Sequence, residues 1–139
     1  MRQASTQIAV ATAGPGLTDI TRPIAEWIDR QAIATGLLTL LCRHTSASLL
    51  INENASAAVR RDIQRYFASI APEDACRYEH DEEGADDMPA HLRTALTSVS
   101  LSIPVSDGAM ALGTWQGVFL FEHRAAPHRR TLALHLLGE

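Results

Sequence analysis

The sequence contains no lysine: all 12 basic residues are arginines, set against 16 acidic residues for a net charge of −4. Catalysis through a lysine Schiff base is therefore excluded. Aromatic residues are also few, at 5%. Because the chain lacks both a basic stripe for phosphates and enough aromatic rings to stack bases, we expect no nucleic-acid partner.

Cysteines and long apolar runs are equally scarce. Cys42 and Cys76 lack CxxC spacing and are predicted to be buried or half-buried free thiols, and Cys42 is not expected to act as a nucleophile. No stretch approaches the roughly 20 apolar residues of a membrane span. Residues 1–10 lack the basic-then-apolar order of a signal peptide, so the sequence predicts a cytoplasmic protein without a membrane partner. No glycine-rich phosphate loop is present either.

What the sequence does have is enough apolar material for one core. Its 139 residues, 46% of them hydrophobic, suit a single domain over residues 1–139. Apolar runs and alternation predict strands at residues 3–13, 37–42, 48–52, 101–105, 118–122 and 131–136. Because helices interrupt these strands without strict βαβ order, the predicted fold is α+β, with a mixed, largely antiparallel sheet and about three helices.

Helix signals place the three helices. The first starts at a Thr21 cap and ends before Gly36, the second runs from an Asn54 cap to Ile70, and the third covers Pro89 to Val99. Helical spacing predicts inward faces made of Ile24, Trp27 and Ile28; of Val59, Ile63, Phe67 and Ile70; and of Leu92, Leu96 and Val99. Asp107 and Gly108 predict a turn, and His135 alternates out of phase with the buried side of its strand.

Three of the six histidines stand at polar junctions. His44 follows a buried strand, His80 lies in an acidic loop, and His91 lies in the first turn of the third helix. Three neutral imidazoles that leave one position open make a known catalytic zinc arrangement. The alternative is that these histidines are only hydrogen-bonded or exposed, and His123, His128 and His135 are weaker candidates still.

Residues 73–87 contain eight carboxylates in fifteen positions. Such a segment is either a solvated loop or a place where a divalent cation or cationic substrate gathers acidic groups. Asp86 and Asp87 directly precede the third helix, where capping would hold them in place.

Two further segments have two interpretations each. Trp115 and Gln116 stand between Gly113 and Gly117, so the indole belongs either to the core or to a surface that approaches a ligand. Residues 124–130 offer three guanidiniums suited to phosphate oxygens, or form a solvated hairpin loop.

Together these motifs resemble the YjbQ family, known as secondary thiamine-phosphate synthases. The resemblance rests on His44-Thr45-Ser46-Ala47-Ser48, Asn52-Glu53-Asn54, Tyr78-Glu79-His80-Asp81, Glu83-Gly84-Ala85-Asp86-Asp87-Met88-Pro89-Ala90-His91, Gly113-Thr114-Trp115-Gln116-Gly117 and Arg129-Arg130. It spans nearly the whole chain. It implies a compact α+β homotrimer with a site near the subunit boundary, and condensation of a hydroxymethylpyrimidine diphosphate with a thiazole phosphate to give thiamine phosphate and diphosphate, as a weak or secondary activity.

The resemblance also implies roles for individual residues. His44, His80 and His91 would bind a divalent metal, zinc in preference to magnesium because the ligands are imidazoles. His44, Asp81, Asp86 and Asp87 would be catalytic, the aspartates by orienting the ligands or attracting cations. Small phosphorylated substrates would contact Ser46, Asn54, Trp115, Gln116, Arg129 and Arg130.

Two other functions stay open. A zinc-like site is better matched to activating water than to holding diphosphate, which favours a metal-dependent hydrolase or phosphatase of a small phosphorylated metabolite. A non-catalytic, trimeric ligand-binding or regulatory protein would instead bind such a metabolite without turning it over.

Overall fold

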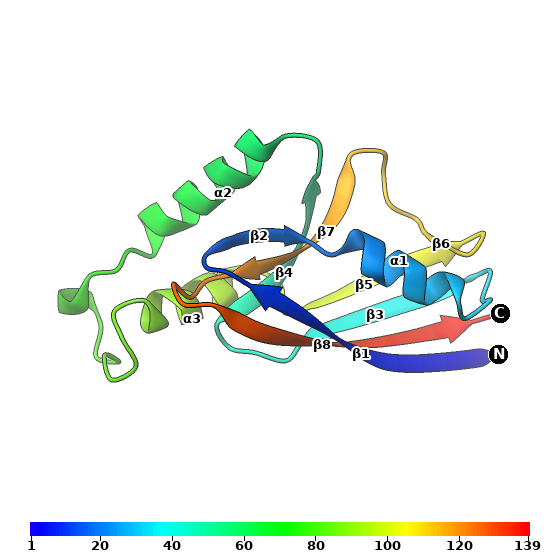
Figure 1. Cartoon of the computed structure of the whole chain (residues 1–139), viewed down its shortest axis with the longest axis horizontal. Coiled ribbons are helices and arrows are strands. Elements are labelled where there is room, and N and C mark those ends of the chain that lie inside the picture. Colours follow the sequence, from blue (N-terminus) through cyan, green and yellow to red (C-terminus); the bar gives the residue numbers. More distant parts are fainter.

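The computed structural model describes the whole chain, residues 1–139, as two antiparallel sheets and three α-helices (Figure 1). The larger sheet has the order β1 (Arg2–Thr12), β8 (His128–Gly138), β3 (Gly36–Cys42), β5 (Ser100–Ser106) and β6 (Ala109–Met110). The smaller sheet has the order β2 (Gly16–Asp19), β7 (Gln116–Glu122) and β4 (Ala47–Glu53). The predicted α+β class with a largely antiparallel sheet is confirmed, although the strands form two sheets rather than one.

The helices are α1 (Thr21–Asp29), α2 (Ala57–Ile70) and α3 (Asp87–Leu96), with a 3₁₀ turn at Ala75–Arg77 inside the acidic loop. No helix has the length and apolar character needed to cross a lipid bilayer.

One hydrophobic cluster of 17 buried residues joins both sheets to α1. The predicted inward face of α1 is confirmed, since Ile24, Trp27 and Ile28 are all buried. On β8, Leu132, Leu134 and Leu136 are buried at alternating positions. The intervening His135 is only half-buried and bonds Gln3, so its predicted position away from the core is confirmed too.

Helix boundaries differ from the prediction for local reasons. The chain leaves α1 at Asp29, and Ala32, not Gly36, takes the left-handed conformation with φ 51°. Gly36 instead begins β3, where a Cβ would collide with the carbonyl oxygen of Leu137. Asn54 stays at the end of β4 because its N–H donates to the Trp115 carbonyl, and Ser56 caps α2 by accepting from the N–H of Ala58.

The predicted inward face of α2 is right in part and that of α3 is wrong. No residue of α2 is fully buried, and Figure 1 shows this helix running out beyond the sheets. Val59, Ile63 and Phe67 are half-buried, with the Phe67 ring against Phe121 of β7, whereas Ile70 is 45% exposed. On α3, Leu96 is 62% exposed, whereas Asp87, Ala90 and Thr94 are buried. Helical spacing identified an apolar stripe on each helix but carried no information about which surface each stripe would meet.

Two segments next to α3, the turn before β4 and the segment after β7, come together because β4 and β7 are antiparallel. Ala47 pairs with Glu122 at one end of this pair, and Glu53 pairs with Gln116 at the other. The turn before β4 and the segment after β7 therefore meet at one end of the smaller sheet, where α3 contacts β4.

Candidate metal centre

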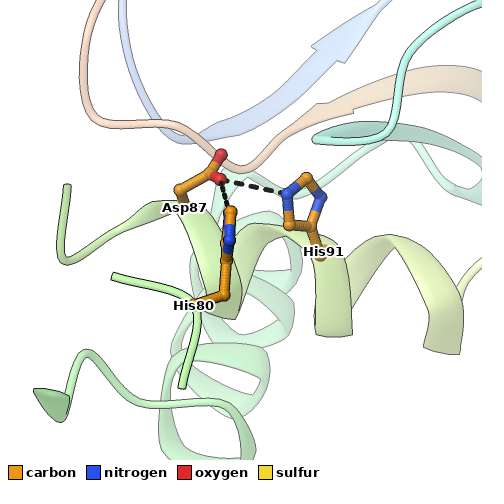
Figure 2. Close-up of side chains that lie close together, drawn as sticks. All are labelled: His80, Asp87 and His91. Carbon is orange, nitrogen blue, oxygen red and sulfur yellow. Dashed lines mark hydrogen bonds and ion pairs between the residues drawn. The ribbon is translucent and has the colours of Figure 1, made fainter. Parts of the chain in front are cut away.

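His80, Asp87 and His91 point toward one another beside the first turn of α3 (Figure 2). Asp87 and His91 lie four residues apart on the same helix, so their side chains share one face. The ring atoms Nε2 of His80 and Nε2 of His91 lie 2.7 and 3.0 Å from Oδ2 of Asp87. All three potential ligand atoms lie within 4.8 Å of one another.

Asp87 is held from the other side by Arg124. The carboxylate is 1% exposed, and its Oδ1 accepts a hydrogen bond of 2.7 Å from Nη1 of Arg124. Nε of the same guanidinium donates to Oδ2 of Asp86, which ties the segment after β7 to the start of α3. Burial alone would raise the pKa of Asp87, but the hydrogen bond from His80 and the charges of His91 and Arg124 lower it. Asp87 is thus kept ionised as an oriented carboxylate.

His91 is oriented by a backbone carbonyl. Its Nδ1 lies 2.8 Å from the carbonyl oxygen of Thr45, so Nδ1 carries the proton that makes this bond. In a neutral His91 the lone pair on Nε2 then faces the Asp87 carboxylate, and two hydrogen-bond acceptors meet. Either a second proton or a metal cation between them satisfies both groups.

The donor set suits zinc. Two imidazole nitrogens and one carboxylate oxygen form the protein ligands of known catalytic zinc sites, and a carbonyl that accepts from the outer ring nitrogen is the usual supporting contact. The hydrogen bond to Asp87 raises the pKa of His80, so zinc competes with a proton for this ring. The residues present therefore fit a zinc ion.

His44 lies outside this group. Its Nε2 accepts a hydrogen bond of 2.7 Å from the N–H of Thr131. Burial, followed by the charge of Arg130, lowers the pKa of His44. The structure thus brings His80 and His91 together, with Asp87 rather than His44 as the third group.

The other predicted site residues lie in four separate places. Asp81 is exposed in the loop and makes no hydrogen bond. Arg130 is 4% exposed, pairs with buried Glu122, and donates from Nη2 to Oγ of Ser46 at 3.0 Å. Arg129 is exposed on the opposite side of β8 from Arg130.

Asn54, Trp115 and Gln116 gather at the far end of the smaller sheet. The N–H of Asn54 donates to the Trp115 carbonyl, and Oε1 of Gln116 accepts from the N–H of Gly113. Trp115 is 65% exposed and is therefore not part of the core. The full length of β7, roughly 20 Å at about 3.3 Å per residue, separates this group from the end that holds Asp87.

Three residues that hold the site were not predicted in these roles. Arg124 was one of the guanidiniums expected to suit phosphate, and the structure uses it to hold Asp86 and Asp87. Thr45 acts only through its carbonyl, which side-chain chemistry does not reveal. Glu122 could have been found from the sequence, as a single carboxylate at the end of an apolar strand. It is 1% exposed and accepts hydrogen bonds from Arg130 and Thr12. The two cysteines are free, as predicted, but only Cys42 is buried; Cys76 is exposed, so its predicted burial is wrong.

Comparisons with known proteins agree on one family. The model of the family described as UPF0047 protein YjbQ-like matches residues 6–139. A UPF0047 protein of Synechocystis sp. is 48% identical over 138 residues, 99% of this chain and 94% of the relative. The UPF0047 protein YjbQ of Salmonella typhimurium is 50% identical over 107 residues, 77% of each chain. The resemblance seen in the motifs is confirmed.

Solved structures agree with the fold. A conserved hypothetical protein from Thermus thermophilus superposes with a TM-score of 0.85 at 32% identity, covering 95% of this chain and 99% of that one. A YbjQ-like protein of unknown function from Sulfolobus solfataricus reaches a TM-score of 0.90 over 99% of both chains, at 24% identity.

Proposed function

Because the chain belongs to the UPF0047 YjbQ-like family, we propose that it is a zinc-dependent enzyme that hydrolyses a small phosphorylated metabolite, with the metal held by His80, Asp87 and His91. One observation carries the proposal: two imidazole nitrogens and a buried carboxylate oxygen converge within 4.8 Å. Zinc is favoured over magnesium because magnesium prefers oxygen ligands and keeps several waters.

The surroundings of these residues suit a catalytic rather than a purely structural metal. His80 remains 41% exposed, so the site is open to solvent and leaves a coordination position free. The carboxylates of Glu82 and Glu83 in the same loop add negative charge near His80 that attracts a cation. When bound, zinc supplies Lewis-acid chemistry that polarises phosphate oxygens and makes water a stronger acid.

The chain's own part is orientation. Arg124 fixes the Asp87 carboxylate and Thr45 fixes the His91 ring, so both ligands are held in place before the metal arrives. Asp86 acts through Arg124, since its Oδ2 accepts from Nε at 3.0 Å. His44 and Ser46 belong to the neighbouring turn, where substrate could approach the metal from one side.

The test is release of inorganic phosphate from a panel of small phosphorylated metabolites, using chelator-treated protein with zinc or magnesium restored. We expect zinc-dependent release that falls at least about 100-fold in His91→Ala, the size expected for loss of a ligand. His135→Ala is the matched control, because His135 lies on the outer face of the larger sheet, and it should keep full activity. Release without metal, or undiminished release by His91→Ala, refutes the proposal. Saturable binding without turnover would favour a regulatory role.

A second candidate is the synthase reaction, in which a pyrimidine methylene forms a bond to the thiazole nitrogen as its bond to diphosphate breaks. The exposed Trp115 indole beside Asn54 and Gln116 favours it, since a flat apolar surface suits a pyrimidine ring. This group lies about 20 Å from Asp87 in its own chain. The reaction therefore needs a homotrimer in which one subunit's Trp115 meets the neighbour's metal group.

Subunit mixing tests this second candidate. Trp115→Ala and His91→Ala trimers, each inactive in thiamine phosphate formation, should recover part of the activity after mixing and reassembly, because some sites would then combine two intact halves. Absence of product from the wild type, or absence of recovery in demonstrated mixed trimers, argues against a shared synthase site.

A further inference from the structure

A depression of about 480 Å³ lies over the turn between β3 and β4 and is separate from the metal ligands. Its lining consists of Cys42, Arg43, His44, Thr45, Ser46 and Arg130. No carboxylate is among these residues, although the chain as a whole is acidic. The hydrogen-bonding groups available to a ligand in this depression are the free polar atoms of His44, Arg130 and Ser46.

His44 offers a donor to this depression. Because Nε2 accepts from the N–H of Thr131, the proton of the neutral ring is on Nδ1. Nδ1 makes no hydrogen bond within the chain. The ring is therefore anchored through one nitrogen and presents an N–H from the other.

Arg130 is anchored in a similar way. Nε donates to Oε2 of Glu122 at 2.6 Å, and Nη2 donates to Oε1 of Glu122 and to Ser46. Nη1 makes no hydrogen bond within the chain and is not among the buried polar atoms that lack a partner. Glu122 itself is 1% exposed and is not part of the lining. The guanidinium is thus held from behind, with one pair of N–H groups left for a ligand.

The turn adds further donors. Oγ of Ser46 accepts from Arg130, so its hydroxyl hydrogen is free to donate. The backbone N–H groups of Thr45 and Ser46 make no hydrogen bond within the chain, and consecutive free amides in a bend favour anions. The exposed Arg43 adds positive charge at the rim. Donors with no competing acceptor side chain suit a phosphate group.

A neighbouring depression shares lining residues with this one and reaches the metal ligand His91. His44 and Thr45 also line a second depression, of about 580 Å³, together with His91 and residues of α3. Thr45 thus stands between the two sites, since its carbonyl holds His91. On the metal side the exposed groups are the carboxylates of the acidic loop, which repel anions.

We propose that the β3–β4 turn is an anion subsite that binds the phosphate group of a small metabolite, with His44 as an N–H donor and Arg130 and Arg43 as cationic partners. The identity of the anion as the substrate's phosphate rests on the proposed function, whereas the existence of the subsite does not. His44 then binds the ligand and not the metal. A ligand that carries a second phosphate group would extend along the neighbouring depression toward His91, so that the turn anchors one phosphate and the other, beside the metal, is the one hydrolysed.

The experiment titrates inorganic phosphate and, separately, zinc into the full chain by calorimetry, with phosphate measured in metal-free buffer. His44→Gln removes the Nδ1 donor while leaving an oxygen able to accept from Thr131, which guards against misfolding. We expect it to weaken phosphate binding about 10- to 100-fold, as for loss of a hydrogen bond to a charged group, and to leave zinc binding unchanged. His91→Ala should do the reverse.

A matched pair of arginine variants separates a specific site from general charge. Arg43→Gln should weaken phosphate binding several-fold, whereas Arg61→Gln removes an equally exposed arginine from α2 and should have no effect. Equal losses in these two variants, or no saturable phosphate binding by the wild type, overturn the anion subsite. Loss of zinc in His44→Gln also overturns it, because His44 would then be a metal ligand. If the wild type binds phosphate as expected but does not bind zinc, the result counts against the proposed function and not against this subsite.

Discussion

Asp87→Asn is the most direct test of the metal centre, because both histidines and Arg124 converge on this one carboxylate. Oδ2 lies 2.7 Å from His80 and 3.0 Å from His91, while Oδ1 accepts from Arg124 at 2.7 Å. Asparagine has the same shape but only one oxygen. If that oxygen keeps the bond to Arg124, the amide NH₂ faces the two Nε2 atoms and blocks the position of the metal.

The size of the effect follows from these contacts. Loss of a supporting partner already lowers metal affinity 10- to 100-fold, so loss of a charged ligand should lower zinc affinity at least about 100-fold, or about 2.7 kcal/mol. Without metal, the variant also loses the charge that faces Arg124 in a site where Asp87 is 1% exposed. Because Arg124 keeps Asp86 as a partner and its side chain is 18% exposed, this loss should lower the free energy of unfolding by only about 2 kcal/mol.

Zinc affinity is measured by competition with a chromophoric chelator, and stability by urea unfolding in the presence of a strong chelator. Asp81→Asn is the control, since it removes the same charge from an exposed carboxylate that makes no hydrogen bond. It should change zinc affinity less than about threefold and stability by less than about 0.5 kcal/mol. Zinc binding by Asp87→Asn within threefold of the wild type, or an equal loss in Asp81→Asn, would refute the reasoning.

Three further predictions concern stability. Burial lowers the pKa of His123 to about 3. Below about pH 6.5 the unfolded chain therefore binds a proton on this ring that the folded chain does not bind. As a result, His123 lowers the free energy of unfolding as the pH falls from 6.5 toward 3, by up to about 1.4 kcal/mol per pH unit, and has no such effect above pH 6.5. Urea unfolding from pH 7.5 to 4.5 should show a shallower decline for His123→Gln than for the wild type, and equal slopes would contradict the assignment. Glu122→Gln leaves the Arg130 side chain, 5% exposed, without its counter-charge, and urea unfolding should show a loss of about 3–5 kcal/mol; a loss under about 1 kcal/mol would show that the pair is not effectively buried. Gly36→Ala places a methyl group against the backbone of β8 and should cost about 1–3 kcal/mol in the same assay, whereas Gly113→Ala, with its nearest neighbour at 3.4 Å, should cost clearly less.

Most strands were predictable because their signal is local. The run from Leu37 to Cys42 and the alternation from Thr131 to Leu136 each predict a strand, and β3 and β8 form there. On β3, however, only Leu38, Leu40 and Cys42 are buried, whereas Leu37 and Leu41 are 45% exposed. Helix α1 was equally clear from Ile24, Trp27 and Ile28. The short β2 and the two-residue β6 were missed, because segments this short contain too few residues to show an apolar–polar alternation.

In helices α2 and α3, local sequence patterns did not predict which residues are buried. Ile70 and Leu96 sit at regular helical spacing with other apolar residues, yet both are exposed. The face of α3 that meets the sheet carries Asp87 and Thr94, because that face must hold the polar site. Spacing reports that a helix has an apolar side but not whether this chain supplies the surface that covers it.

The sequence by itself determined the family, the α+β class and the concentration of imidazoles and carboxylates between His80 and His91, because motifs, periodicity and composition are properties of short segments. Only the tertiary structure decided which groups meet. It placed Asp87 between His80 and His91, bound His44 to Thr131, and left Trp115 at the opposite end of β7. These outcomes depend on the antiparallel register of β4 and β7 and on the pairing of Arg124 with Asp86 and Asp87, contacts between segments far apart in the chain, whose free energies no single segment reveals.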